Sequence, residues 1–323
     1  MLRKARVAGI GSYLPETILT NDDLSKILDT SDDWIIQRTG IRARHQAAEG
    51  EMTSDLGTKA AQKAMDNAGV TIADIDLILV ATTTPDLTFP ATAALIQKNL
   101  GMKQGAAFDM QAVCSGFVYG MSVASAMIET GQAQRALLIG AETMTRLLDW
   151  SDRGTAVLFG DGAGAVLIEA CELGGLDEAH IVGSYLRSDG SLSDILYVDG
   201  GPSSTGTTGH LIMQGKEVYR HAVGKISEAI TSLLASTGYG VEDIDWFVPH
   251  QANKRIIEGV AKRIGLPEEK TVVSIEKHAN TSAASIPLAL DCAVRDGRVK
   301  AGDLIMLEAM GGGLSWGANL LRW

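Results

Sequence analysis

The sequence predicts an α/β protein built from two related halves. Apolar runs of strand length alternate with longer helical segments, which favours layers of sheets and helices. A short motif recurs along the chain, which indicates a duplicated unit. The 323 residues include 36 glycines and only 5% aromatic residues, so helices and strands can pack closely.

The individual elements follow from the length and character of each segment. Short apolar runs are typical of buried strands, and longer segments of small and apolar residues are typical of helices. We expect strands at residues 77–81, 136–141, 246–249 and 303–309. We expect helices at residues 54–67, 115–130, 222–236 and 283–295.

The recurring motif has the same form in both copies: a glycine, then Asp-Ile-Asp, then an apolar strand. The interval from Gly69 to Gly238 equals the interval from Asp74 to Asp243, and we call it the repeat interval. A helical segment precedes each copy. We therefore divide the chain into an N-terminal half, residues 1–170, and a C-terminal half, residues 171–323.

A second pair of equal intervals extends the repeat to two residues with candidate catalytic side chains. The interval from Cys114 to Gly131 equals the interval from Asn280 to Gly297. Glycine commonly ends a helix, so each interval predicts a helix that begins near Cys114 or Asn280. We expect these two residues at equivalent helix N-termini, where two facing halves bring them together with His250.

Composition limits the classes of protein that this chain can be. An apolar fraction of 46% and a charged fraction of 21% exclude disorder as the main state. The net charge of −11 argues against a nucleic-acid-binding protein, although it leaves room for a local basic patch.

The cysteines and the apolar runs predict a cytoplasmic protein. Three cysteines, far apart and without a Cys-x-x-Cys pair, are typical of free thiols in a reducing compartment. No apolar stretch approaches the roughly 20 residues of a membrane helix. Residues 1–15 are interrupted by glycine and proline, which favours a strand and turn over a signal peptide.

Cys114 is the candidate nucleophile. It follows a strand-like segment and precedes a helix, where the positive end of the helix dipole lowers a thiol pKa. A buried structural cysteine is the alternative, and this segment alone does not decide between them. Cys171 and Cys292 lack the setting and are interpreted as structural.

His250 and Asn280 are the candidate polar partners of the nucleophile. His250 follows a strand, where an imidazole can project into a site and transfer protons. His278 competes with it, and spacing does not choose between the two. Asn280 is suited to capping a helix, or to donating hydrogen bonds to an oxyanion without adding negative charge.

Two glycine-rich segments are candidate ligand-binding loops. The run Gly311–Gly313 allows close backbone approach and presents N–H groups, but a plain turn is the alternative. It lacks a following Gly-Lys-Ser/Thr, and residues 160–164 lack the dinucleotide-binding spacing. Nothing in the sequence indicates NAD, ATP or a metal.

Several motifs, taken in order, resemble the β-ketoacyl-acyl-carrier-protein synthase III family of the thiolase superfamily. They are Ser31-Asp-Asp-Trp-Ile, Arg38-Thr-Gly-Ile-Arg, Cys114-Ser-Gly-Phe, Asp152-Arg-Gly-Thr, Phe159-Gly-Asp-Gly-Ala-Gly, Val248-Pro-His-Gln-Ala-Asn, Asn280-Thr-Ser-Ala-Ala-Ser-Ile-Pro and Gly311-Gly-Gly-Leu-Ser-Trp-Gly. The resemblance spans essentially the whole chain. Ala279, where many relatives carry glycine, and Met110-Gln111 depart from the family pattern without removing a catalytic group.

The resemblance implies a thiolase-like five-layered αβαβα fold of two pseudo-symmetric halves, usually a homodimer. It implies a catalytic triad of Cys114, His250 and Asn280, which selects His250 over His278. The implied reaction transfers a short acyl group, with acetyl-CoA the expected donor, to the cysteine. Malonyl-acyl-carrier protein then loses CO2 and condenses with it, without a cofactor or metal.

The resemblance also implies roles for further residues. Backbone N–H groups of Cys114 and Gly312 would form the oxyanion hole. The CoA-contacting positions are Trp34, Arg38, Thr39, Arg153 and Asn253. The acyl-pocket positions are Phe89, Phe159 and Met213, where the family's counterpart of Phe89 comes from the dimer partner and restricts chain length.

A basic cluster after His250 is a candidate docking site for the acidic carrier protein. It consists of Lys254, Arg255, Lys262 and Arg263 on one predicted helix. Arg255 and Lys262 share a face, since they are separated by almost two full turns. A solvated helix face is the alternative for this cluster, and an exposed salt bridge is the alternative for each CoA-site arginine.

Other functions compete with this prediction. The same triad serves condensing enzymes of secondary metabolism or with longer, branched primers. A degradative thiolase needs a second cysteine near the last glycine-rich segment, and none follows Cys292. A non-catalytic acyl- or CoA-binding protein and a cysteine hydrolase are the remaining alternatives.

Overall fold

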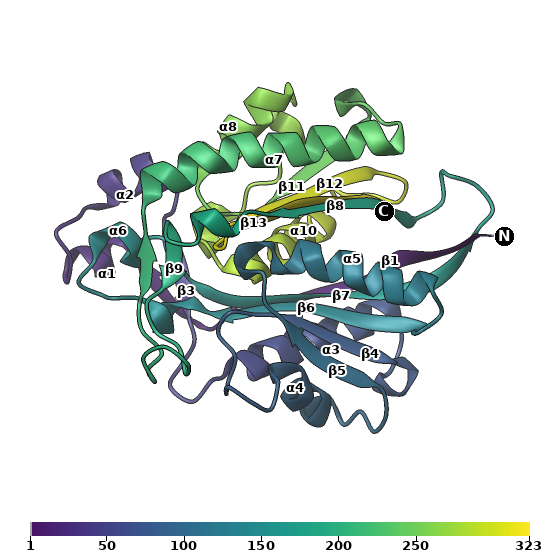
Figure 1. The fold of residues 1–323 in the computed structure, drawn as a ribbon, viewed down its shortest axis with the longest axis horizontal. Helices are drawn as coiled ribbons and strands as arrows, with labels where there is room; N and C mark the ends of the chain where they lie inside the picture. Colours follow the sequence, from purple (N-terminus) through teal and green to yellow (C-terminus); the bar gives the residue numbers. More distant parts are fainter. Residues whose placement is uncertain (1) are drawn as a thin grey trace.

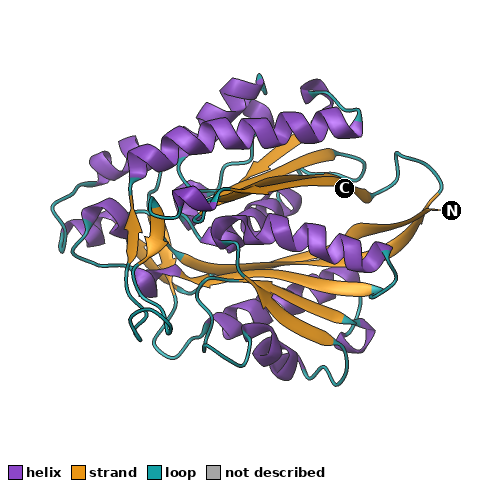
Figure 2. Ribbon diagram, viewed as in Figure 1, coloured by secondary structure: helices purple, strands orange, loops and turns teal. Residues whose placement is uncertain are grey.

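A computed structural model describes residues 2–323 and arranges them in five alternating layers of helices and sheets (Figures 1 and 2). The first sheet has the order β1 (Leu2–Tyr13), β7 (Asp161–Leu173), β6 (Arg135–Thr143), β4 (Leu77–Ala81), β5 (Ala106–Met110). The second has the order β8 (His180–Ser188), β13 (Ser315–Arg322), β12 (Leu304–Gly311), β11 (Trp246–Pro249). Two small antiparallel pairs join β2 (Thr17–Thr20) to β3 (Ala43–Gln46) and β9 (Leu196–Val198) to β10 (Leu211–Met213).

Three helical layers cover and separate the two sheets (Figure 1). The outer layer on the first sheet is α3 (Thr53–Ala68) and α4 (Thr92–Leu100), and the outer layer on the second is α7 (Gly215–Thr237) and α8 (Lys254–Ile264). The middle layer is α5 (Gly116–Glu129) and α10 (Ser285–Arg295). Shorter helices are α1 (Asn21–Ser25), α2 (Asp32–Thr39), α6 (Arg153–Ala156) and α9 (Ile275–His278). This layering confirms the predicted five-layered αβαβα fold.

The second sheet repeats the order and register of four of the five strands of the first, and only β5 has no counterpart within the described part of the chain. In the first, Leu77 of β4 pairs in parallel with Ala136 of β6, and in the second Trp246 of β11 pairs with Ile305 of β12. Each residue lies one repeat interval from its counterpart in the other sheet. The predicted strands 77–81 and 246–249 are found with the same bounds.

The Asp-Ile-Asp motif recurs because each of its residues has a structural task. Asp74 caps a short 3₁₀ turn by accepting from the Thr71 backbone N–H at 2.9 Å, and Asp243 does the same for Gly240 at 2.7 Å. The isoleucine is buried in both copies. The second aspartate, Asp76, accepts from the N–H of Arg135 at the start of the next parallel strand. The motif therefore fixes where the two neighbouring strands begin.

Close packing in the middle layer explains the abundance of glycine and alanine. A Cβ atom added to Gly140 of β6 would collide with the backbone of Ala283, just before α10. The middle helices thus lie against the sheets at a distance that larger side chains would not allow.

Two sequence expectations need correction. The expected boundary between residues 170 and 171 falls inside β7, and residues 174–179 make the connection to β8, so we propose the junction of the halves there. The expected helix 222–236 begins earlier, at Gly215, and its first turns place Val218 and Tyr219 in the wall of the main pocket.

The equivalence of Cys114 and Asn280 is also wrong. Two 3₁₀ turns introduce the middle helices, η2 (Val113–Ser115) and η7 (Ser282–Ala284), and they too are separated by the repeat interval. Cys114 therefore corresponds to Ala283, and Asn280 lies upstream of that position. The helix α10 has 11 residues and α5 has 14. This difference makes the interval from Asn280 to Gly297 equal to that from Cys114 to Gly131, although Asn280 lies before the turn.

Candidate active site

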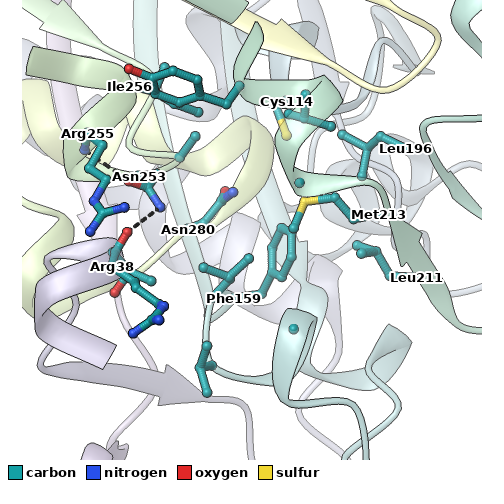
Figure 3. Close-up of a pocket in the computed structure, with 18 of the residues that line it drawn as sticks. Arg38, Cys114, Phe159, Leu196, Leu211, Met213, Asn253, Arg255, Ile256 and Asn280 are labelled. Atoms are coloured by element: carbon teal, nitrogen blue, oxygen red, sulfur yellow. Dashed lines mark hydrogen bonds between the residues drawn. The ribbon is translucent and has the colours of Figure 1, made fainter. Parts of the chain in front are cut away.

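A pocket of about 570 Å³ opens between the halves, with Cys114 and Asn280 among the residues that line it (Figure 3). Cys114, His250 and Asn280 all line it. Most of its remaining wall is apolar, supplied by Met144, Val157, Leu158, Phe159, Leu196, Leu211, Met213 and Met310. The pocket is thus suited to an apolar acyl chain beside a small polar centre.

Cys114 lies in the 3₁₀ turn η2 that leads from β5 into α5. The thiol-bearing residue is only 5% exposed, and this burial raises the pKa of the Cys114 thiol to about 12. The sequence-based expectation of a lowered pKa is therefore wrong, because desolvation of the thiolate outweighs the helix dipole. Cys114 is therefore a neutral thiol at physiological pH.

His250 follows β11, and its backbone N–H donates to the Glu308 carbonyl at 2.8 Å. Its Nδ1 lies 2.6 Å from the Ser285 hydroxyl, while Nε2 has no partner within residues 2–323. Burial lowers the pKa of His250 to about 3, so the imidazole is neutral at physiological pH. His278 does not line the pocket, and its ring meets His45 edge-on at 6.5 Å between centroids.

Asn280 is held through both its side chain and its backbone. Its Oδ1 accepts from the backbone N–H of Ser282, the first residue of the turn η7, at 2.9 Å. The backbone N–H of Asn280 donates to the Leu158 carbonyl at 2.9 Å, and its carbonyl accepts from the Gly160 N–H at 3.0 Å. With the oxygen engaged, the amide N–H groups are oriented as the donor end of the side chain.

The expected CoA-binding residues gather at the pocket mouth. Trp34, Arg38, Thr39 and Asn253 line the pocket. The Arg38 guanidinium lies 4.3 Å from the Trp34 ring centroid, and that of Arg153 lies 4.7 Å from it. Arg153 does not line the pocket and donates to the Asp29 carbonyl at 2.6 Å.

Asn253 joins α8 to α2 at this mouth (Figure 3). Its Oδ1 accepts from the Arg255 N–H at 2.9 Å, which caps α8, and its Nδ2 donates to the Arg38 carbonyl at 3.0 Å. Arg255 also lines the pocket and donates to the Gln37 carbonyl at 2.7 Å. The basic end of α8 therefore borders the entrance.

The remaining predicted residues divide between the pocket wall and other parts of the chain. Phe159 and Met213 line the pocket, whereas Phe89 does not and is 82% exposed on this chain. Gly312 lines a neighbouring cavity of about 1350 Å³, while Gly311 packs against the Cys114 backbone. The remaining basic cluster residues lie along α8: Lys254, Lys262 and Arg263.

Sequence reasoning missed two residues that organise the site. Ser285 contacts His250, and Gln251 clamps the adjacent loops: its Oε1 accepts from the Ser274 and Ile275 N–H groups. Both residues stand within the quoted motifs, Gln251 directly after His250 and Ser285 in the motif that begins at Asn280. Their polarity inside apolar segments was the only available signal.

Within residues 2–323, no cluster of His, Cys, Asp or Glu has the arrangement of a metal site. In the same range no helix has the length and apolarity required to traverse a bilayer.

Comparison with known proteins decides the family. The family model for the C-terminal part of 3-oxoacyl-(acyl-carrier-protein) synthase III matches residues 234–323, and a second model of that synthase matches residues 108–190. The chain is 60% identical over 318 residues to the β-ketoacyl-(acyl-carrier-protein) synthase III of Rhizobium meliloti, covering 98% of both chains. The chain belongs to this family.

Further members of the synthase III family match over their full length. The synthase III of Hyphomonas neptunium is 58% identical over 322 residues, covering 100% of both chains. The crystal structure of the Aquifex aeolicus synthase III superposes with a TM-score of 0.93 at 44% identity, over 99% of this chain and 100% of that one. The Pseudomonas aeruginosa synthase III gives 0.94 at 41% identity, over 99% and 98%. These structures confirm the thiolase-like fold predicted from the sequence.

Proposed function

We propose that this synthase III condenses a short acyl-CoA, with acetyl-CoA the expected primer, with malonyl-acyl-carrier protein. The products are a β-ketoacyl-carrier protein, CO2 and CoA, and the reaction initiates fatty acid synthesis. The observation that carries this proposal is the meeting of Cys114, His250 and Asn280 in one largely apolar pocket of a synthase III chain.

In the first step, the Cys114 sulfur attacks the thioester carbonyl of the acyl-CoA. A tetrahedral intermediate forms and collapses with cleavage of the carbon–sulfur bond to CoA. The proton that leaves Cys114 is balanced by the proton gained by the CoA thiolate. Backbone N–H groups of Cys114 and Gly312 are the proposed donors to the transient oxyanion.

In the second step, malonyl-carrier protein occupies the vacated pocket and its carboxylate leaves as CO2. Negative charge then develops on the thioester oxygen, where the neutral side chains of His250 and Asn280 donate hydrogen bonds. The enolate carbon attacks the acyl-cysteine, and Cys114 leaves as thiolate and takes up one proton. Neutral donors suit this step because a carboxylate in either position would repel the enolate.

We propose that the two parts of the acyl-CoA substrate bind at different ends of the pocket. Trp34, Arg38, Thr39, Arg153 and Asn253 are the proposed CoA contacts, with the arginines meeting phosphate through charge-assisted hydrogen bonds. Phe159 and Met213 border the acyl chain in this chain's own pocket. The basic cluster of α8 is the proposed docking site for the carrier protein.

The proposed assembly is a cytoplasmic homodimer that needs no cofactor, since the nucleophile and the donors are the chain's own groups. Phe89 projects from this chain without lining its pocket, which suits a residue that enters the partner's acyl pocket. In that position its ring restricts primers to short chains.

The test is mass spectrometry of the products formed from malonyl-carrier protein and acyl-CoAs of graded length. We expect β-ketoacyl-carrier protein with the shortest primers and a steep loss with longer ones. A preference for long or branched primers would favour the secondary-metabolite alternative. Release of free acid without condensation would favour a hydrolase, and the absence of any β-ketoacyl product would overturn the proposal.

A further inference from the structure

The Ser285 hydroxyl occupies a position between His250 and the backbone that follows it. Its Oγ lies 2.6 Å from His250 Nδ1 and accepts from the Gln251 backbone N–H at 3.2 Å. Ser285 is 2% exposed and His250 is 4% exposed, so water does not replace either contact. Ser285 begins α10, whereas His250 follows β11, so the contact exists only in the folded chain.

Counting donors and acceptors decides the direction of the Ser285–His250 bond. A serine hydroxyl has one proton to donate and two lone pairs to accept. The Gln251 N–H uses one lone pair. If His250 Nδ1 carried a proton, it would use the second lone pair, and the hydroxyl proton would remain buried without an acceptor.

The opposite arrangement satisfies every group. The Ser285 O–H donates to an unprotonated Nδ1 while its oxygen accepts from Gln251. A neutral imidazole whose Nδ1 accepts carries its proton on Nε2. The doubly protonated ring is excluded at neutral pH, because burial lowers the pKa of His250 to about 3.

We propose that Ser285 is a positioning residue that holds His250 in the Nε2–H tautomer, so that the imidazole acts as a hydrogen-bond donor to the enolate of the decarboxylation step. Ser285 touches no substrate and acts only through the ring. The tautomer assignment depends on the hydrogen-bond geometry and on the burial that keeps the ring neutral. Its catalytic consequence rests on the proposed function.

This assignment separates the two half-reactions. A resting Nε2–H group cannot accept the Cys114 proton, so His250 is not the base for acyl transfer in this state. Its contribution falls on the malonyl substrate, where negative charge develops. Loss of Ser285 should therefore affect decarboxylation far more than acyl transfer.

The direct test is nitrogen NMR of the full-length protein labelled with ¹⁵N-histidine. The His250 signals are assigned by their loss in His250→Gln. In the unsubstituted protein we expect a protonated Nε2 and an unprotonated Nδ1. In Ser285→Ala we expect the Nδ1 signal to move, with proton density shared between both nitrogens, and Ser285→Thr, which keeps the hydroxyl, should restore the original pattern.

Ser227→Ala is the matched control, because this buried serine donates only to the Val223 carbonyl within its own helix, α7. It should leave the His250 signals unchanged. A proton on Nδ1 of the unsubstituted protein would overturn the proposal, and so would Ser285→Ala leaving both ring nitrogen signals unchanged.

Kinetics supply the second readout. In Ser285→Ala we expect the kcat for CO2 release from malonyl-carrier protein to fall by about tenfold or more, less than the 10²–10³ of a deleted donor. Formation of acyl-Cys114 should change by less than about twofold by the same reasoning. Equal losses in both half-reactions would overturn the positioning role. The NMR result needs no turnover, so it stands or falls independently of the proposed condensation.

Discussion

The two turns that introduce the middle helices share a backbone and differ in chemistry. Val113 in η2 and Ser282 in η7 both adopt a φ of 50°, a left-handed conformation that side chains other than glycine rarely take. The next residue is Cys114, the proposed nucleophile, in the N-terminal half and the buried Ala283 in the C-terminal half. One backbone design thus presents a thiol in one half and only packing in the other.

The two halves of the duplicated unit therefore contribute different chemical groups to the site. The N-terminal half contributes a thiol in an apolar setting, and the C-terminal half contributes His250 and Asn280, which are neutral hydrogen-bond donors. Their side chains form hydrogen bonds within the C-terminal half, with Ser285 and Ser282, while the Asn280 backbone bonds to Leu158 and Gly160 of the other half. The proposed condensation needs the nucleophile from one half and charge stabilisation from the other.

We expect the largest effect from replacing the proposed nucleophile of the N-terminal half. Cys114→Ser should abolish acyl-enzyme formation and lower condensation by at least about 10³-fold, because a serine hydroxyl here lacks a base to activate it. Intact-protein mass spectrometry after incubation with acetyl-CoA measures the adduct. Cys292→Ser, the same change on α10 of the other half, is the control and should remain acylated. Acylation of the Cys114→Ser protein would contradict the assignment of the nucleophile to this half.

We expect the next largest effect from removing a hydrogen-bond donor of the C-terminal half. Asn280→Ala should slow decarboxylation by about 10²–10³-fold, the usual consequence of a lost oxyanion donor. Acyl transfer to Cys114 should be far less affected. Separate assays of CO2 release and acyl-enzyme formation measure the two steps, and an equal loss in both would contradict the assignment of donors to one half.

The thiol itself can be titrated by alkylation. Because burial raises the pKa of Cys114 to about 12, the rate of reaction with iodoacetamide should rise tenfold per pH unit from pH 7 to beyond pH 9. An unperturbed cysteine is half ionised near pH 8.5 to 9, so its rate levels off about one pH unit above that. Peptide mapping of alkylated Cys114 across this range measures the rate, and an early plateau would show that the N-terminal half lowers the pKa after all.

The central strands offer a matched comparison of stability. Ile139 of β6 and Glu308 of β12 occupy equivalent register positions, opposite Val80 and Pro249, and both are buried. Burial raises the pKa of Glu308 from 4.5 to about 8. The folded protein keeps this proton at pH values where the unfolded chain has lost it, so the free energy of unfolding should fall between pH 4.5 and pH 8.

Glu308→Gln should remove that part of the pH dependence. At pH 8.5 the variant should gain on the order of a few kcal/mol over the parent, and the gain should vanish well below the unfolded pKa of 4.5, where the parent is protonated in both states. Urea unfolding at several pH values measures this. Parallel pH profiles for the two proteins would show that Glu308 is not a destabilising ionised group.

The smallest expected effect concerns the exposed face of α8. Arg255→Glu with Lys262→Glu should raise the KM for malonyl-carrier protein on the order of fivefold, since exposed charge pairs contribute about 1 kcal/mol or less each. Lys98→Glu with Lys103→Glu makes the same charge change in the N-terminal half and should leave this KM unchanged. If the α8 pair also leaves it unchanged, the docking proposal is wrong.

The architecture and the candidate triad could be predicted from the amino-acid sequence. The strands 77–81 and 246–249 were predicted to the residue, because uninterrupted apolar runs between polar motifs form buried parallel strands. The repeat interval identified the duplication, because Asp74 and Asp243 cap their turns through contacts only a few residues away. Local chemistry of this kind is readable without a structure, and the family motifs then named Cys114, His250 and Asn280.

The protonation of the site residues and the correspondence between the halves depend, in contrast, on contacts between segments that are distant in the chain. The thiol pKa depends on desolvation, which is set by side chains distant in sequence, so the helix dipole expected at Cys114 gave the wrong direction. Counting back from the glycine that ends each helix pointed to Asn280, because α10 is shorter than α5. The packed turns show that Ala283 is the counterpart of Cys114. The tautomer of His250 depends on the Ser285 hydroxyl, since a hydrogen bond between β11 and α10 forms only when the layers pack together.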